Sequence, residues 1–447
     1  MTDRPKIIVL DDDPTGSQTV HSCLLLTQWD VATLKQALQD DSPIFFVLTN
    51  TRAMPPEEAA HTTHQVCQQI RQALSETAMD NFLLVSRSDS TLRGHYPVET
   101  DVIAEELGPF DAHFLVPAFF EGGRVTRDSI HYLMVEGIPT PVHETEFARD
   151  SVFAYHHSYL PDYVQEKTQG RIPSQSVERF LLAEIRQGSQ AHLHRLTGNV
   201  CAVVDGETQA DLDRWTSDLW AVAGQGKRFL FRSAASLLTS LAGLPPQPVA
   251  AEGMSQWVRE RQPGVVIVGS HVKKSTEQLQ HLLQQAGTVG IEVEVAQLLG
   301  DPLSEMLSGN PKQALAQAIL HRVNESFGQG KTPVVYTSRQ ELSFDSAATR
   351  LAFGQTVSAL LMDIVQGLPE SIGFLISKGG ITSNDTLSHG LALPAVRLLG
   401  QIAPGCSVVI TPPDHPRFPG LPVVLFPGNV GDAQTLSLIY HRLRNPQ

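Results

Sequence analysis

The sequence predicts an α/β protein of two domains, each built on a mostly parallel β-sheet flanked by helices. Short apolar runs typical of buried strands recur along the chain, and helical patterns lie between some of them, an alternation typical of parallel sheets. The chain has 447 residues, more than one hydrophobic core usually holds. A proline-rich stretch over residues 236–263 separates two such series, so we expect domains of residues 1–240 and 255–447.

The first domain is expected to contain strands that alternate with helices. Val66, Ile70 and Leu74 recur at spacings of four, which places them on one face of a helix. Residues 140–175 show weak periodicity and many aromatic and histidine side chains, so we expect a loop-rich insertion or lid there. The expected strands of this domain are Ile7–Leu10, Ile44–Leu48, Phe82–Val85, His113–Val116, Val200–Val204 and Phe229–Phe231.

The second domain is expected to repeat the same alternation. Leu315, Ile319, Val323 and Phe327 share one face of a predicted helix. Ligands of open α/β sheets bind at the carboxyl ends of the strands, so the loops that follow these strands are candidate sites. The expected strands of this domain are Val265–Val268, Ile291–Val295, Val334–Tyr336, Ile372–Ile376, Val408–Ile410 and Val423–Phe426.

The balance of charges limits the partners of the chain. The formal net charge is −14 and no stripe of lysine and arginine is present, which argues against nucleic acid or an anionic membrane as a main partner. No apolar run is long enough to span a membrane, and the first strand begins without a signal-peptide pattern. Four scattered cysteines indicate reduced thiols and a cytoplasmic protein. Assembly into a homo-oligomer is left open.

The run Ser86–His95 is the most informative segment. It follows the apolar run Phe82–Val85 and contains two arginines, one carboxylate, four hydroxyls and a glycine. Such a segment cannot be core, because each buried charge or hydroxyl would need a partner. Guanidinium groups suit a carboxylate or a phosphate, whereas carboxylates and hydroxyls suit sugar hydroxyls. The run therefore predicts a site for a small polyhydroxylated anion, with a polar surface turn as the alternative.

Three adjacent aspartates, Asp11–Asp13, follow the first expected strand. Their mutual repulsion would bring one pKa closer to neutrality unless a cation, a ligand or solvent relieves it. One interpretation is a haloacid-dehalogenase-type phosphatase, with Asp11 as nucleophile, Asp13 as acid and base, and Lys378 as the lysine such enzymes need. The sequence offers no convincing later acidic pair to hold magnesium for that enzyme. A solvated turn is the other alternative.

A set of motifs in a fixed order gives a more specific result. They are Asp12–Gly16, Asp89–Gly94, Pro117–Phe119 with Gly123–Arg124, His143–Asp150, Gly269–Ser270, Gly379–Ser383 and Pro427–Gly431. With these motifs the chain resembles the four-carbon acid-sugar kinase family, whose members include threonate, erythronate and 3-oxo-tetronate kinases. Each motif alone is weak, whereas the ordered set spans nearly the whole chain.

Three positions depart from the family pattern in the segments that the resemblance assigns to the acid sugar. This chain has Ser17–Thr19 where the family often has a sequence such as Ala-Asn-Asp, so an acidic position is lost. Arg87 replaces a more usual lysine, and His95 replaces a frequent asparagine. These differences leave the kinase interpretation intact and leave the identity of the acid open.

Three strands of the second domain are each followed by a turn that contains glycine. The turns are Gly269–Thr276, Gly379–Ser383 and Pro427–Gly431. Glycine lets a backbone approach phosphate closely, and parallel strands end at one edge of a sheet, so the three turns predict one ligand site. Ser275 and Gln278 have the spacing of a helix-capping box. The spacing of glycine and lysine is not that of a Walker A loop.

The resemblance implies an ATP-dependent kinase that uses magnesium and phosphorylates a hydroxyl of a small sugar acid in the cleft between the domains. Asp12 is expected to be the base or the hydroxyl-orienting group, and Arg93 is expected to meet the transferring phosphate. A non-catalytic sugar-acid-binding protein is the remaining alternative, and no magnesium ligand is assigned. The expected acid-binding residues are Asp12, Arg52, Arg87, Ser88, Asp89 and Ser90, with Arg52 and Arg87 on the carboxylate. The expected nucleotide-binding residues are Ser270, Gly379, Gly380, Ile381, Thr382, Ser383, Gly428 and Asn429.

Overall fold

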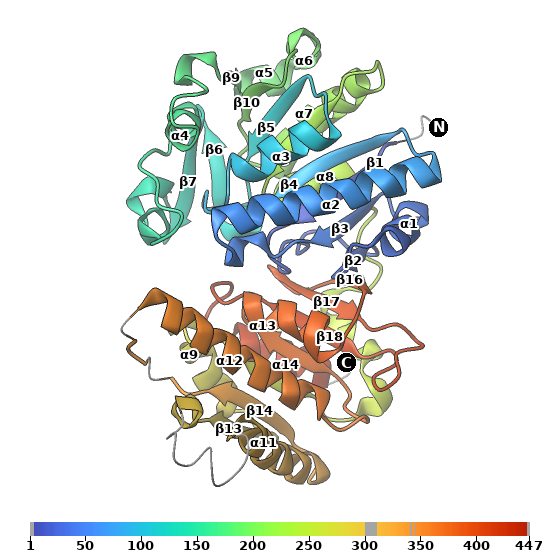
Figure 1. Ribbon diagram of the computed structural model, residues 1–447, viewed down its shortest axis with the longest axis vertical. Helices are drawn as coiled ribbons and strands as arrows, with labels where there is room; N and C mark the ends of the chain where they lie inside the picture. The colour runs from blue at the N-terminus through green and yellow to red at the C-terminus, as the bar shows by residue number, and fades with distance from the viewer. Residues whose placement is uncertain (1–3, 300–310, 340–341, 345, 445–447) are drawn as a thin grey trace. The chain divides into compact units, whose positions relative to one another are not determined.

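The structure is a computed structural model that describes residues 4–299, 311–339, 342–344 and 346–444. The chain divides into two compact units, residues 1–246 and residues 247–447. Each unit has a largely parallel sheet with helices on both faces, which confirms the predicted α/β class (Figure 1). Among the described residues, no helix combines the length and the apolar character needed to cross a membrane.

The sheet of the N-terminal unit has the order β2-β3-β1-β4-β11-β5-β10-β9, and every neighbouring pair is parallel. All the strands expected in this unit are confirmed, because each is a continuous buried apolar run. The two short strands β2 and β9 were not predicted. The bounds are β1 Lys6–Asp11, β2 Leu24–Leu26, β3 Ile44–Leu48, β4 Phe82–Arg87, β5 Ala112–Val116, β9 Glu178–Phe180, β10 Val200–Val204 and β11 Phe229–Ser233.

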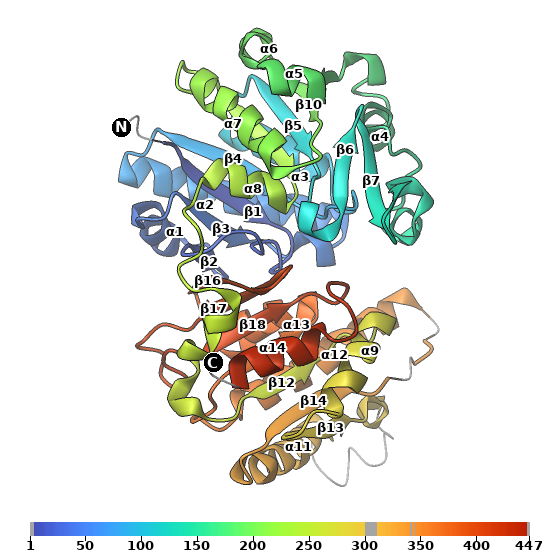
Figure 2. The ribbon, with the colours of Figure 1, turned by 180° about the vertical axis from the view of Figure 1, so that it is seen from behind.

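Helices cover both faces of this sheet. Helices α1 (Val31–Gln39), α2 (Pro56–Thr77) and α3 (Val98–Leu107) lie on one face (Figure 1). Helices α7 (Gln209–Ala223) and α8 (Ala235–Ala242) lie on the other face (Figure 2), and the short α5 (Leu182–Gln187) and α6 (Gln190–Arg195) pack on α7. The predicted apolar face of α2 is confirmed, since its members Val66, Ile70 and Leu74 are buried.

The segment between β5 and β9 is more ordered than the sequence indicated. An antiparallel sheet of β6 (Arg124–Arg127), β7 (Ile130–Val135) and β8 (Ile138–Pro141) precedes helix α4 (Leu160–Lys167). Within residues 140–175, where the sequence indicated a loop-rich insertion or lid, the structure has the end of β8, short 3-10 turns and the helix α4. The buried side chains of this stretch form one apolar cluster with the segment that follows β4; they include Val142, Tyr155, Leu160 and Tyr163 together with Leu92 and Tyr96.

The sheet of the C-terminal unit has the order β13-β14-β12-β15-β18-β17-β16. The strands from β13 to β18 in this order are parallel, whereas β16 and β17 are antiparallel to their neighbours. The expected strand at residues 408–410 is thus part of an antiparallel hairpin, and the expected strand at residues 372–376 begins later. The bounds are β12 Val265–Val268, β13 Thr288–Val293, β14 Thr332–Thr337, β15 Leu375–Lys378, β16 Ala395–Ala403, β17 Cys406–Ile410 and β18 Pro422–Phe426.

Helices also cover both faces of the second sheet (Figures 1 and 2). Helices α12 (Ala347–Gln366) and α13 (Gly380–Asp385) lie on one face together with α11 (Pro311–Gly328), which packs on α12. Helices α9 (Lys273–Leu283) and α14 (Thr435–Arg444) lie together on the other face. The expected apolar face of α11 is present, with Ile319 and Val323 buried. All four cysteines of the chain are buried thiols outside disulfide bonds.

Candidate functional site

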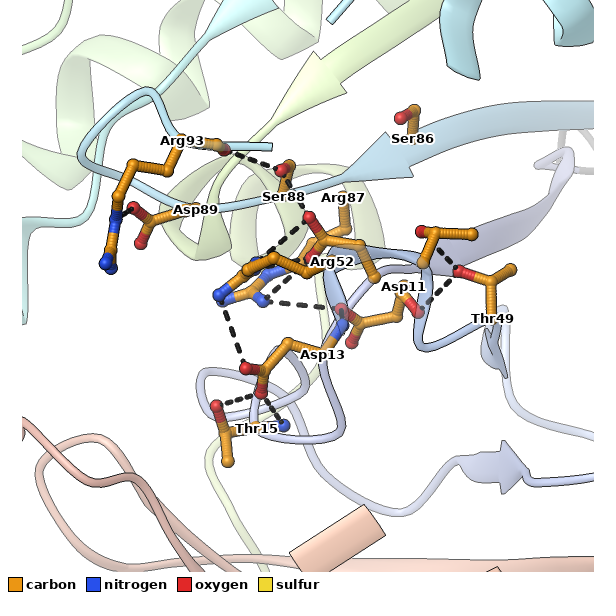
Figure 3. Close-up of polar contacts among 12 residues, drawn as sticks. Asp11, Asp13, Thr15, Thr49, Arg52, Ser86, Arg87, Ser88, Asp89 and Arg93 are labelled. Carbon is orange, nitrogen blue, oxygen red and sulfur yellow. Dashed lines mark hydrogen bonds and ion pairs between the residues drawn. The ribbon is translucent and has the colours of Figure 1, made fainter. Parts of the chain in front are cut away.

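Three neighbouring strands of the N-terminal unit bring the predicted acid-binding residues together. In the order β3-β1-β4, Asp11 ends β1, Arg87 ends β4, and Arg52 lies on a short 3-10 turn that follows β3. Figure 3 shows these side chains gathered at the same edge of the sheet. Because neighbouring parallel strands end at the same edge of a sheet, the loops that follow them meet at that edge.

Asp12 and Arg52 form the centre of this cluster. The Arg52 guanidinium donates from Nη2 to Asp12 Oδ1 at 2.5 Å and from Nε to Asp12 Oδ2 at 3.2 Å. It also donates from Nη1 to Asp13 Oδ2 at 3.3 Å, and Ser88 Oγ donates to Asp12 Oδ2 at 2.5 Å. Burial opposes the charge of Asp12, but nearby guanidinium groups, Arg52 first, outweigh it and hold its pKa below the ordinary value. Asp12 is therefore an ionised carboxylate with both oxygens engaged.

Asp11 and Arg87 form a second, deeper pair. Arg87 Nη1 lies 3.3 Å from Asp11 Oδ1 and 3.9 Å from Asp12 Oδ1, and the Arg87 side chain is only 6% exposed. Burial raises the pKa of Asp11 to about 7, although the charge of Arg87 opposes this rise. The carboxylate of Asp11 is covered by Gly16, where a Cβ would lie 2.1 Å from Asp11 Oδ2. Arg87 thus stabilises the turn from its buried side. The Arg52 side chain is more accessible, at 20% exposed.

The loop after β4 carries the other predicted acid-binding groups. Asp89 Oδ2 accepts from Arg93 Nε at 2.8 Å and from the Thr91 hydroxyl. The Arg93 guanidinium also lies 3.6 Å from Asp150 and 5.0 Å from the centre of the Phe147 ring. Burial opposes the charge of Asp89, yet Arg93 and then Arg52 hold its pKa well below the usual range. This pair lies to one side of Arg52 and Asp13 (Figure 3).

Residues from the segment between β5 and β9 hold the backbone of this loop. His131 Nε2 bonds to the Ser90 carbonyl at 2.7 Å, and Tyr155 and Tyr163 donate to the next two carbonyls at 2.7 and 2.9 Å. Gly94 has a φ of +117°, and a Cβ there would lie 2.4 Å from Ser88 Oγ. Only glycine fits that position without strain, and the three hydrogen bonds to the carbonyls hold the loop in this conformation.

The three glycine-bearing turns of the C-terminal unit also meet. Gly269 N donates to Lys378 O at 3.2 Å, and Gly379 N donates to Phe426 O at 2.8 Å, which joins the ends of β12, β15 and β18. The hydroxyl of Ser275 lies 3.0 Å from both Ser270 Oγ and the Gly428 carbonyl. The predicted capping role of Ser275 is wrong, because α9 begins earlier and Ser275 lies inside it. Its hydroxyl connects two of the turns instead.

A cavity of about 370 Å³ opens beside these turns. Most predicted nucleotide-binding residues line it, namely Ser270, Gly379, Gly380, Ile381 and Thr382. Among the described residues, Ser383, Gly428 and Asn429 are not part of its wall; Ser383 is buried and Asn429 is exposed. The apolar part of the cavity wall includes Val295, Leu342, Phe344, Phe353, Val357 and Leu361.

Glycine shapes the polar end of the cavity. A Cβ on Gly269 would lie 2.2 Å from Thr382 Oγ1, and a Cβ on Gly379, whose φ is +125°, would lie 3.0 Å from the same atom. Arg339 fixes the first turn by donating to the Ser270 carbonyl at 2.7 Å. Lys378 donates to the carbonyls of the third turn from below, and burial lowers its pKa to about 7. The three turns are thus held in place by these hydrogen bonds, and side chains at the glycine positions would fill the space beside them.

Each of the two compact units is matched by a family model of its own. A model described as a sugar-binding N-terminal domain matches residues 7–241, and one described as a nucleotide-binding C-terminal domain matches residues 265–436. The chain belongs to the four-carbon acid-sugar kinase family. The first match covers the cluster around Asp12 and Arg52, and the second covers the glycine-lined cavity.

Curated members of the acid-sugar kinase family match along most of their length. The D-erythronate kinase of Heliobacterium modesticaldum is 27% identical over 421 residues, which are 89% of this chain and 88% of that protein. The D-threonate kinase of Salmonella typhimurium is 25% identical, with 96% of each chain covered. Two solved structures share the fold. One, from Salmonella typhimurium LT2, has a TM-score of 0.70 and 19% identity, with 98% of both chains covered. The other, from Haemophilus influenzae, has a TM-score of 0.63 and 16% identity, with 98% of this chain and 100% of that chain covered.

Within this family fold, the structure adds residues that the sequence did not single out. Arg232 on β11 donates from Nη1 to Glu99 Oε2 at 2.8 Å and to Ser86 Oγ at 3.1 Å. Glu99 accepts in turn from Thr51 Oγ1 at 2.6 Å, next to the turn that carries Arg52. In the sequence, Arg232 is marked only by its position at the end of an apolar strand. It lies beside β4 because β11 pairs with β4, and the sequence alone does not reveal this pairing.

The geometry argues against the phosphatase alternative. Asp11 would be the nucleophile of such an enzyme, but its side chain is fully buried beneath Gly16 and its pKa is raised, so it is poorly placed to attack phosphorus. Lys378, the candidate lysine, belongs to the other unit and bonds to the carbonyls of the Pro427–Gly428 turn.

Proposed function

We propose that the protein is an ATP-dependent kinase that transfers the γ-phosphate to a hydroxyl of a four-carbon or similarly small sugar acid. The observation that carries this proposal is the fixed cluster of carboxylates, hydroxyls and arginines at the ends of β1, β3 and β4. Its composition matches a polyhydroxylated anion, and it lies in the domain that the family model describes as sugar-binding. The names of the curated relatives support the same reaction and substrate class.

Phosphoryl transfer needs positioning and charge neutralisation more than covalent help from the protein. We assign Asp12 to the acceptor hydroxyl, because it is an ionised carboxylate held by Arg52 and Ser88. Asp89 and the Ser90 segment would bind the remaining hydroxyls. Arg93, whose side chain is 22% exposed, would face the transferring phosphate.

The cavity of the C-terminal unit fits a nucleotide. Its apolar wall suits a purine ring, and the glycine turns leave room for phosphate against the backbone. Magnesium would neutralise phosphate charge when bound. Within the described residues no group of three or more histidine, cysteine, aspartate or glutamate side chains could hold a metal ion. Magnesium in such enzymes is usually bound by substrate phosphates together with one or two carboxylates.

A coupled ADP-release assay tests this function. Purified protein with ATP and magnesium is screened against D-erythronate, D-threonate and their stereoisomers, and we expect ADP release that depends on one or more of these acids. Phosphate release from a phosphorylated acid without ATP would support a phosphatase instead. Binding of the acid by calorimetry with neither reaction would support a non-catalytic binding protein.

A further inference from the structure

The arginines around the candidate acid site differ in one respect. Each of four arginines has a carboxylate partner: Arg52 with Asp12, Arg87 with Asp11, Arg93 with Asp89, and Arg232 with Glu99. Arg124 makes no ion pair with any residue that the structure describes. A buried or half-buried cation without an anion is costly, so it needs an explanation.

The local backbone holds Arg124 in one place. Arg124 and Phe119 exchange two backbone hydrogen bonds of 2.9 and 3.0 Å in the tight turn after β5. The guanidinium donates from Nη1 to the Gly122 carbonyl at 2.6 Å and lies 5.8 Å from the centre of the Phe119 ring. A Cβ on Gly122 would lie 2.1 Å from Arg124 Nη1, so glycine is needed for this packing. The Nε atom is buried and has no hydrogen-bond partner among the described residues.

Arg124 belongs to the same assembly as the acid-binding loop. It begins β6, which pairs with β7, and His131 on β7 bonds to the Ser90 carbonyl. Asp89 and Arg93 are among the charges that act on the Arg124 guanidinium. Burial lowers the pKa of Arg124, and the opposing charges of Asp89 and Glu146 do not compensate for it. The position therefore combines a fixed guanidinium, a missing counter-charge and nearby groups suited to sugar hydroxyls.

We propose that Arg124 binds the carboxylate of the sugar acid. This inference rests on the proposed function, since it names the residue that recognises the acid group of that substrate. A guanidinium matches a carboxylate in a planar, two-point contact, and such a contact would give Nε its missing partner. The carboxylate is present whenever the acid is bound, whereas the transferring phosphate arrives with the nucleotide. Arg52 and Arg87, the other candidates for the carboxylate, already hold aspartates of the protein.

The test compares the acid with its primary amide, which keeps the hydroxyls and loses the charge. Affinities are measured by calorimetry without ATP for the wild type, Arg124→Gln and Arg124→Lys. We expect Arg124→Gln to weaken binding of the acid about 10- to 100-fold, as for loss of a charged hydrogen bond, and to leave the amide unchanged. Arg124→Lys should keep part of the preference for the acid. Arg127→Gln is the matched control, because Arg127 lies on the same strand but is exposed and pairs with Glu207.

Two results would overturn the inference. A normal preference for acid over amide in both Arg124 variants would remove Arg124 from the carboxylate. A fall in kcat with unchanged acid affinity would assign it to the phosphate instead. The calorimetric comparison needs no ATP, so it is separate from the ADP-release screen, which can fail for the wild type while the effect of Arg124 on acid binding persists. A wild type that binds no sugar acid would overturn both proposals.

Discussion

At the scale of single residues, the three adjacent aspartates meet three different environments. Asp11 is buried with Arg87, Asp12 is held by Arg52 and Ser88, and Asp13 is partly exposed. The sequence predicts that repulsion brings one pKa closer to neutrality and makes Asp12 the candidate base. In the structure the raised pKa belongs to Asp11, and that of Asp12 is lowered. Repulsion within the motif was predictable, whereas the position of each arginine was not, because it depends on which strands pair.

Asp12→Asn tests the central role of this carboxylate. The change keeps the shape but removes the charge that balances Arg52 and that we propose orients the acceptor hydroxyl. We expect kcat to fall about 10²-fold or more, the usual scale for loss of an acid or base group, with ATP affinity nearly unchanged. Asp13→Asn is the control, because Asp13 contacts the same arginine through one oxygen only and should cost less. Turnover close to normal in Asp12→Asn would exclude Asp12 from the reaction.

Asp11→Asn tests the buried acid. Burial raises the pKa of Asp11 from 3.8 to about 7, so the folded protein keeps a proton that the unfolded chain releases between these values. This group therefore lowers the free energy of unfolding as pH rises from about 4 to 7. Asparagine removes the contribution, and we expect a less negative slope of stability against pH in that window. Urea unfolding of both proteins at several pH values measures it; parallel curves would contradict the assignment.

At the scale of secondary-structure elements, the sequence was informative where one local pattern was enough to identify an element. Continuous apolar runs predicted the inner strands, and parallel order then predicted that the loops after β1, β3 and β4 meet. The hairpin of β16 and β17 was missed as such, because β16 alternates buried and half-buried residues and includes Gly400. The packing of residues 140–175 was missed because short strands and 3-10 turns leave no long period. Arg232 became visible only once β11 had its neighbours. Arg124 belongs to a motif found in the sequence, but its surroundings became visible only once β6 had its neighbours.

His131→Gln tests how the insertion supports the loop after β4. Burial lowers the pKa of His131 from 6.5 to about 4, so between these values the unfolded chain binds a proton that the folded protein does not. The contribution of His131 to stability therefore decreases as pH falls from 6.5 to 4. Glutamine can still donate to the Ser90 carbonyl but does not titrate. We expect thermal melts of the variant to lose less stability than the wild type over this range, and an identical pH dependence would contradict the buried neutral state.

At the scale of the whole molecule, the two predicted sites belong to different compact units. The cluster of carboxylates and arginines draws its residues from the N-terminal unit, whereas every residue of the 370 Å³ cavity belongs to the C-terminal unit. Each sheet has its own hydrophobic core, so damage confined to one site should leave binding at the other intact. This separation allows the acid and nucleotide assignments to be tested independently in the full-length protein.

Gly354→Leu tests the nucleotide assignment. Gly354 lies on α12 in the cavity wall, and a Cβ there would meet no protein atom within 4 Å, so the first carbon of an added side chain has room beside the cavity. We expect ATP affinity to fall by at least about tenfold, or 1.4 kcal/mol, while affinity for the sugar acid stays the same. Gly328→Leu is the control, because Gly328 on α11 has equally open surroundings and does not line the cavity. Calorimetry measures each ligand separately. Unchanged ATP binding in Gly354→Leu would remove the nucleotide from this cavity, and equal loss of both ligands would show that the two sites do not act independently.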